Sequence, residues 1–141
     1  MIVSNGYVST NEFTVKEGME EHLKYILDNI CFKGTIETDV FKRNGYTYGW
    51  FRCFGSISGL VLKEYDSEED MIDDEYNEFD IMIEELQKCV REDDYIQIFI
   101  MKYQDSRYSL GGSFILTSTE ATYIDILLEG RETARKILNK A

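Results

Sequence analysis

Apolar residues recur at helical spacing near the start of the chain. Thr14 and Glu17 stand three residues apart, as in a capping box, where side chains satisfy the free amides at a helix start. Apolar side chains then return every three or four residues, which places them on one helix face; they are Met19, Leu23, Ile26 and Ile30. The pattern predicts a helix over residues 16–30, ended by Gly34.

Alternating apolar and polar residues follow this helix and predict strands. Residues 36–40 alternate, and residues 46–54 are rich in β-forming side chains. An Asn-Gly pair separates the two segments, which is the strongest short signal for a hairpin turn. We predict a further turn over residues 55–59, which begins and ends with glycine, and a third strand over residues 60–65.

The middle of the chain has a second helical pattern. Ser67 and Asp70 have the spacing of a capping box, and acidic residues crowd the first turns, where the helix dipole favours negative charge. Apolar residues again recur at intervals of three and four, at Ile72, Tyr76, Phe79, Ile83, Leu86 and Val90. We therefore predict an amphipathic helix whose apolar stripe packs on the rest of the protein.

The last third of the chain returns to strand signals. Residues 95–103 form an apolar run typical of a central strand. Residues 106–112 contain a glycine pair and predict a turn, after which residues 114–117 are expected to pair with that strand. Residues 121–128 fit either a strand or a helix. Residues 131–139 predict a C-terminal helix.

These elements define the expected fold class. Adjacent strands joined by short turns favour an antiparallel sheet, and three helices are available to pack on it, so the class is α+β. The expected order is α-β-β-β-α-β-β-(β)-α. No long linker or internal repeat divides the sequence, so we expect residues 1–141 to form a single α+β domain.

The charge is concentrated in one segment. The chain has 27 acidic and 15 basic residues, a formal charge of −12. Between Glu64 and Asp94 there are 15 acids and two bases, so this segment carries −13 and the remainder +1. Such a concentration creates a local field that steers association with a basic partner.

The predicted outward side of the acidic helix suggests a contact surface. At about 100° per residue, Ile81 points away from the apolar stripe and is surrounded by acids, like an interface anchor with a polar rim. The expected partner-binding residues are Asp70, Asp73, Asp74, Asn77, Glu78, Ile81, Glu84 and Glu85. The alternative is a solvated charged face, on which one exposed apolar side chain has no function.

Aromatic residues share one face of the strand at residues 46–54. Tyr46, Tyr48 and Trp50 alternate there, with Arg52 on the same side. Such side chains can stack on the rings of a nucleotide or another small ligand. The alternative is that they form part of the core. The negative charge opposes binding of a nucleic-acid backbone, whose phosphates need bases.

Few residues offer catalytic or metal-binding chemistry. Three separated cysteines without a CxxC pair favour reduced thiols and no zinc site. His22 is the only histidine, and we interpret it as a surface or hydrogen-bonded residue of the first helix. Acids alternate from Asp66, but Met71 stands where a calcium loop needs glycine. We expect no metal, no cofactor and no enzymatic activity.

Charge distribution therefore gives the leading functional hypothesis. We expect an acidic inhibitor that occludes the basic, nucleic-acid-binding surface of a partner enzyme. Phage anti-defence proteins (anti-CRISPR or anti-restriction) and toxin-immunity proteins act in this way. The alternative is a module that binds a small molecule or nucleotide signal on Tyr46, Tyr48, Trp50 and Arg52.

Location and assembly follow from weaker signals. The start of the sequence has no signal-peptide pattern and no run of about 18 apolar residues occurs, so a cytoplasmic protein without a membrane partner is expected. Direct nucleic-acid binding is not expected. The strand edge at residues 96–101, if left unpaired, could support a homodimer.

Overall fold

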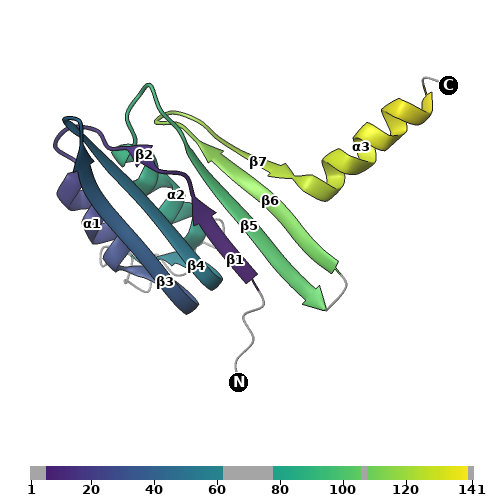
Figure 1. Cartoon of the computed structure of the whole chain (residues 1–141), viewed down its shortest axis with the longest axis horizontal. Helices are drawn as coiled ribbons and strands as arrows, with labels where there is room; N and C mark the ends of the chain where they lie inside the picture. The colour runs from purple at the N-terminus through teal and green to yellow at the C-terminus, as the bar shows by residue number, and fades with distance from the viewer. Residues whose placement is uncertain (1–5, 62–77, 106–107, 140–141) are drawn as a thin grey trace, which may run out of the picture.

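The structure is a computed structural model that describes residues 6–61, 78–105 and 108–139 (Figure 1). The described residues form seven strands and three helices. In chain order these are β1 (Gly6–Thr10), β2 (Phe13–Thr14), α1 (Glu20–Asp28), β3 (Ile30–Arg43), β4 (Tyr46–Leu60), α2 (Glu78–Cys89), β5 (Ile96–Asp105), β6 (Tyr108–Leu116), β7 (Ala121–Asp125) and α3 (Ile126–Asn139). The α+β class is confirmed.

All seven strands belong to one antiparallel sheet. Strand β4 pairs along one edge with β3 and along its other edge with β1 and β2, which follow one another. Strand β1 then pairs with β5, β5 with β6, and β6 with β7. The N-terminal strands therefore join the β3–β4 hairpin to the β5–β7 half of the sheet.

Helices α1 and α2 cover one face of the sheet (Figure 1). The core between them and the strands includes Leu23 and Ile26 of α1, Leu86 of α2, and Phe51 and Ile98 of the sheet, none of which is exposed to solvent. Helix α3 follows β7 directly and extends away from the sheet, contacting β6 and β7 near its start (Figure 1).

Several predicted elements are confirmed with shifted ends. The first helix is shorter than residues 16–30, because β3 already begins at Ile30. The hairpin turn at Asn44 and Gly45 is present, and both residues have positive φ, 54° and 82°, as such turns require. The ambiguous segment 121–128 divides into the end of the sheet and the start of α3.

Other sequence-based predictions are wrong. The glycine-bounded turn at residues 55–59 does not exist, since β4 runs through it. Gly55 faces Gly34 in the β3–β4 pair, and a Cβ on either residue would overlap a carbonyl oxygen of the opposite strand. These glycines permit close strand approach instead of a chain reversal. Residues 111–112 likewise lie within β6, and β1 and β2 were not predicted at all.

The condition set for a dimer edge at residues 96–101 is largely not met. Strand β5 pairs with β6 from Ile96 onwards and with β1 over residues 98–102, so residues 98–101 are paired on both sides. The expected third strand at residues 60–65 falls largely outside the described residues, except that Leu60 ends β4. None of the helices in the described ranges combines the length and the apolar character that a membrane crossing requires.

Candidate binding surfaces

The acidic segment is only partly described. Its described portion comprises α2 and the loop that leads into β5. Four of the expected contact residues, Asp70, Asp73, Asp74 and Asn77, lie outside the described residues, as does the predicted cap at Ser67. Glu78 and Glu84 are exposed, as is Asp80 between them.

Ile81 is not an exposed anchor. Its side chain is 8% exposed and belongs to the core, so its predicted outward position is wrong. The predicted stripe is real, because Ile83 and Leu86 are also buried, but the buried side of α2 is wider than that stripe. Helix α1 packs against α2 while α2 packs on β4, so a second side of α2 is covered.

Glu85 is also inside. It is 5% exposed, and one of its carboxylate oxygens, Oε1, lies 3.4 Å from Nε2 of His22. The other oxygen, Oε2, forms an ion pair with Lys88. Glu85 therefore pairs with His22 and Lys88 of the same chain, and of the expected contact residues in α2 only Glu78 and Glu84 are exposed.

The aromatic strand is not part of the core either. Along β4, Thr47 and Phe51 are buried towards the helices, whereas Tyr46 is 49% exposed and Trp50 and Arg52 are partly exposed. These exposed residues lie on the sheet face opposite α1 and α2, which we call the open face. Within the described residues, no helix covers the open face beside β3 and β4 (Figure 1).

The open face carries alternating arginine and aromatic side chains. The Arg43 guanidinium lies 4.6 Å from the Tyr48 ring centre, and that of Arg52 lies 5.6 Å from the Trp50 ring. Arg91 lies 4.7 Å from the Tyr46 ring. These distances are those of cation–π contacts. We call the set the aromatic ladder; its members are Tyr7, Phe41, Arg43, Tyr46, Tyr48, Trp50, Arg52, Phe54 and Arg91.

Ring contacts continue the aromatic ladder across neighbouring strands. Phe41 of β3 stacks on Tyr48 with ring centres 5.6 Å apart and planes 16° apart. Tyr7 of β1 contacts Phe54 at 5.2 Å. Tyr46 and Phe54 are eight residues apart on β4, so at about 3.3 Å per residue the ladder extends over about 26 Å.

Each arginine of the aromatic ladder has an acidic partner. Arg43 pairs with Glu12 at 3.2 Å, and Arg52 pairs with Glu37 at 2.6 Å. Arg91 pairs with Asp93 at 3.3 Å. The cationic groups are thereby held in place, and the positive charge of the ladder is balanced by neighbouring carboxylates.

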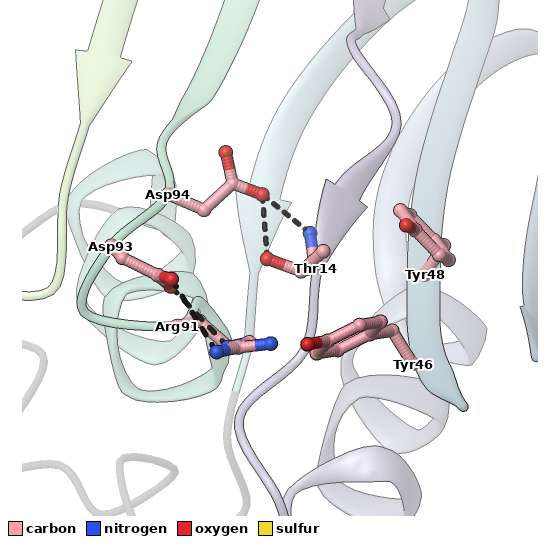
Figure 2. A pocket seen from close by; sticks show the side chains of 6 residues that line it. All are labelled: Thr14, Tyr46, Tyr48, Arg91, Asp93 and Asp94. Carbon is pink, nitrogen blue, oxygen red and sulfur yellow. Dashed lines mark hydrogen bonds and ion pairs between the residues drawn. The ribbon is translucent and has the colours of Figure 1, made fainter. Parts of the chain in front are cut away.

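A pocket lies at one end of the aromatic ladder (Figure 2). Its volume is about 250 Å³, and it is lined by Thr14, Tyr46, Tyr48, Arg91, Asp93 and Asp94. Figure 2 shows the Arg91 guanidinium between Asp93 and Tyr46, with Tyr48 farther along β4. The pocket therefore combines aromatic, acidic and basic groups from three segments that are distant in sequence.

Backbone hydrogen bonds fix the walls of this pocket. The Arg91 amide donates to the Thr14 carbonyl at 3.1 Å, and the Lys16 amide donates to the Cys89 carbonyl at 2.7 Å. The Val15 amide donates to the Thr47 carbonyl at 2.8 Å. The chain after β2 is thereby held to both the end of α2 and the start of β4.

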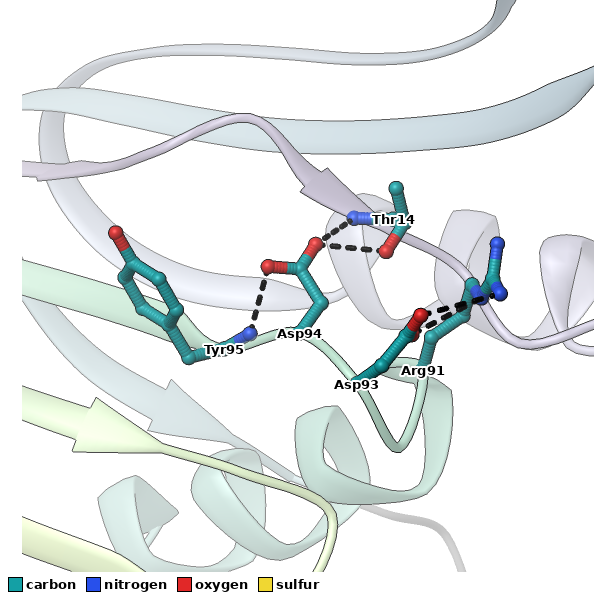
Figure 3. Close-up of polar contacts among 5 residues, drawn as sticks. All are labelled: Thr14, Arg91, Asp93, Asp94 and Tyr95. Atoms are coloured by element: carbon teal, nitrogen blue, oxygen red, sulfur yellow. Dashed lines mark hydrogen bonds and ion pairs between the residues drawn. The ribbon is translucent and has the colours of Figure 1, made fainter.

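Asp94, which lines the pocket, accepts three hydrogen bonds (Figure 3). Its Oδ2 accepts hydrogen bonds from the Thr14 amide at 2.7 Å and the Thr14 hydroxyl at 2.6 Å, and its Oδ1 accepts one from the Tyr95 amide at 2.8 Å. Burial alone would raise the pKa of this carboxyl. The hydrogen bonds to Thr14 and Tyr95 and the charge of Arg91 outweigh burial and lower the pKa below its ordinary value.

The cysteines and the histidine have structural environments. Cys89 is buried, and desolvation, reinforced by the charge of Glu85, raises the pKa of its thiol to about 12. Burial also raises the pKa of Cys53. His22 contacts the carboxylate of Glu85. Among the described residues, no three His, Cys, Asp or Glu side chains gather in a way that could hold a metal ion.

Sequence patterns found part of the open face but missed the pocket. Tyr46, Tyr48, Trp50 and Arg52 were recognised as one strand face. Thr14 was recognised only as a helix-start signal, and Arg91, Asp93 and Asp94 only as charges. Their one visible signal is an Arg-Glu-Asp-Asp run between a helix and a strand, which is typical of a turn.

Comparisons with known proteins add no family. Protein-family models, curated proteins and solved structures were all compared with the chain, and none gave a significant match.

Proposed function

We propose that this chain is a protein-binding module rather than an enzyme, and that the aromatic ladder is its contact surface. The observation on which this proposal depends is that aromatic and arginine side chains follow one another along the open face of β4, where no helix of the described residues covers them, and that ion pairs within the chain hold the arginines. Tyrosine, tryptophan and arginine are the residues that most often dominate binding energy at protein interfaces.

The charge pattern favours a protein over a nucleic acid as the partner. A nucleic-acid surface needs cations that can neutralise phosphates. Here Arg43, Arg52 and Arg91 are paired with Glu12, Glu37 and Asp93, respectively, in a chain whose net charge is −12.

The extent of the ladder also favours a protein over a small ligand. Its length of about 26 Å, at about 3.3 Å per residue, exceeds what a single nucleotide contacts. A protein surface can cover the whole strip. The small-ligand alternative would involve only Tyr46, Tyr48, Trp50 and Arg52.

The partner that we propose is basic. The acidic segment that ends at Asp94 contributes −13, and its field accelerates the approach of a positively charged protein. Nucleic-acid-processing enzymes have such surfaces, so inhibition of one of them remains our proposed activity. The structure changes the proposed contact region, because Ile81 and Glu85 are internal.

Site-specific photo-crosslinking in host cells tests the contact surface. A benzophenone amino acid replaces Tyr46 on the ladder or, as a matched control, Tyr25 on α1; both side chains are large, aromatic and exposed, at 49% and 41%. A third variant carries it at Glu84, on the exposed side of α2.

The three variants give distinguishable results. Cross-linking to a basic protein from position 46 and not from position 25 supports the proposal. Cross-linking from position 84 alone would show that the partner contacts the acidic helix α2 and not the aromatic ladder. Equal cross-linking from all three positions, or none from position 46, would overturn the ladder as the interface.

A further inference from the structure

We propose that the pocket at the end of the aromatic ladder receives a basic side chain, a guanidinium or an ammonium group, from the partner. This inference rests on the proposed function, because it supplies the first specific recognition element of the ladder. The pocket residues are Thr14, Tyr46, Tyr48, Arg91, Asp93 and Asp94.

The charge of the lining favours a cation. Two carboxylates, Asp93 and Asp94, face one guanidinium, that of Arg91, so the ionised pocket carries one net negative charge. Arg91 is already paired with Asp93. An incoming anion would meet this pair and a second carboxylate, whereas a cation would compensate the excess charge.

Asp94 accepts hydrogen bonds unequally on its two oxygens. Its Oδ2 accepts two hydrogen bonds from Thr14, but its Oδ1 accepts one, from the Tyr95 amide. A carboxylate has about four acceptor positions, two on each oxygen. Among the described residues, Oδ1 therefore accepts one hydrogen bond fewer than Oδ2.

Arg91 shows that the local chemistry suits a guanidinium. Its guanidinium lies 4.7 Å from the ring centre of Tyr46, and its Nε lies 3.3 Å from Oδ1 of Asp93 (Figure 2). A ring face next to a carboxylate is the combination that binds protein and ligand cations. The pocket places the Asp94 carboxylate near these groups, so a second cation would meet the same kinds of partner.

Size and rigidity also fit one side chain. At about 250 Å³ the pocket is smaller than the roughly 300–1,000 Å³ of drug-sized ligand sites. Backbone hydrogen bonds between Arg91 and Thr14 and between Val15 and Thr47 hold its walls, so little ordering is needed when a side chain enters.

An NMR titration of the isolated protein tests this inference without a partner. Backbone amide shifts of Thr14, Asp94 and Tyr95 are followed while N-acetyl-arginine amide or, as the anionic counterpart, N-acetyl-glutamate amide is added. The arginine probe should give saturable shifts at these residues, and the glutamate probe should not.

Matched variants localise the effect. Asp93→Asn removes one pocket charge from a side chain that is 72% exposed, so folding should be preserved. Its affinity for the arginine probe should fall about fivefold or more. Asp28→Asn removes an exposed charge at the end of α1 and should bind like the unaltered protein.

Failure here is distinct from failure of the proposed function. Shifts with glutamate instead of arginine, or no saturable shift with either probe, would overturn the cation pocket even if position 46 cross-links to a partner. Equal affinities of the Asp93→Asn and Asp28→Asn variants would also overturn it. Saturable arginine binding without any cross-link from position 46 would support the cation pocket and contradict the proposal that the aromatic ladder is an interface.

Discussion

The carboxylate of Glu85 on α2 lies 3.4 Å from Nε2 of His22 on α1, and its second oxygen pairs with Lys88. This relationship joins the two helices that cover the sheet. It also explains why a glutamate from a highly acidic helix is 5% exposed, because burial of a charge requires partners that compensate it.

Glu85→Ala should destabilise the fold, since it leaves the buried side of His22 without its acceptor. The expected loss in free energy of unfolding is about 1–3 kcal/mol, the usual cost of removing a partner of a buried polar contact. Urea unfolding followed by circular dichroism measures it. Glu84→Ala, one residue away but exposed, is the control and should stay within about 0.5 kcal/mol of the original protein. Equal effects of the two changes would contradict the assigned role of Glu85.

Ile81→Ala should behave as a core mutation. The side chain is 8% exposed, so truncation should lower the free energy of unfolding by about 2–5 kcal/mol. Chemical denaturation measures the loss. An exposed interface anchor would instead leave stability unchanged and speed only the dissociation of the partner, and that result would show that α2 presents Ile81 to solvent.

Asp94→Asn should destabilise the protein in a pH-dependent way. The pKa of Asp94 is lowered in the folded state from an ordinary value of 3.8, so its ionised form is preferred in the fold. Its stabilisation is therefore complete above pH 3.8 and is lost as the pH falls through the lower folded pKa. At neutral pH the variant should lose about 1–3 kcal/mol, because the carboxylate accepts charge-assisted hydrogen bonds.

Thermal unfolding of both proteins between pH 2 and pH 7 measures this difference. The difference in stability between the unaltered protein and the Asp94→Asn variant should be constant near neutral pH. It should become smaller below about pH 4, because the Asp94 carboxylate of the unaltered protein becomes protonated there. A gap that widens on acidification would contradict the lowered pKa.

Gly34→Ala should be strongly destabilising. Gly34 has a φ of 105°, and a Cβ there would overlap the carbonyl oxygen of Phe54 on the paired strand. Gly18→Ala is the control, because Gly18 also has a positive φ, 87°, but no atom lies within 4 Å of the added Cβ. Both variants carry a conformational cost of about 1–2 kcal/mol, and the Gly34 variant should lose clearly more. Similar melting temperatures for the two variants would contradict the close approach of β3 and β4.

Cys53 and Cys89 should resist alkylation in the native protein. Burial raises the pKa of both thiols, that of Cys89 to about 12, so almost no thiolate forms at neutral pH. Cys31 is partly exposed and should be modified first. Mass spectrometry after brief treatment with iodoacetamide gives the order, and rapid loss of the Cys89 thiol before unfolding would contradict its environment.

The spacing of apolar residues was sufficient to predict a helix and its buried face where only one face of the helix packs on the core. Leu23 and Ile26 marked α1, and Ile83 and Leu86 marked the side of α2 that packs on the sheet. Residues 55–59 show its limit: glycine weakens a strand in most contexts, but here Gly34 and Gly55 lie opposite each other and let two long strands approach. Only the pairing partner distinguishes that use of glycine from a turn.

The candidate binding surfaces also depended partly on local patterns and partly on packing between elements. Alternation alone placed Tyr46, Tyr48, Trp50 and Arg52 on one side of a strand, but it could not tell a covered side from an open one. Ile81 was assigned to solvent because a single stripe was counted, whereas α1 covers a second side of α2.

Patterns among neighbouring residues were enough to predict the α+β class, most helices and strands, and the concentration of negative charge before Asp94, because these features depend on the local order of residues along the chain. Packing of the elements against one another determines which faces are covered and which distant residues come into contact. It buried Glu85 against His22, left Trp50 on the open face, and brought Thr14 to Asp94 across 80 positions of sequence. Burial and pocket geometry are properties of packed elements, so a pattern confined to one element cannot specify them.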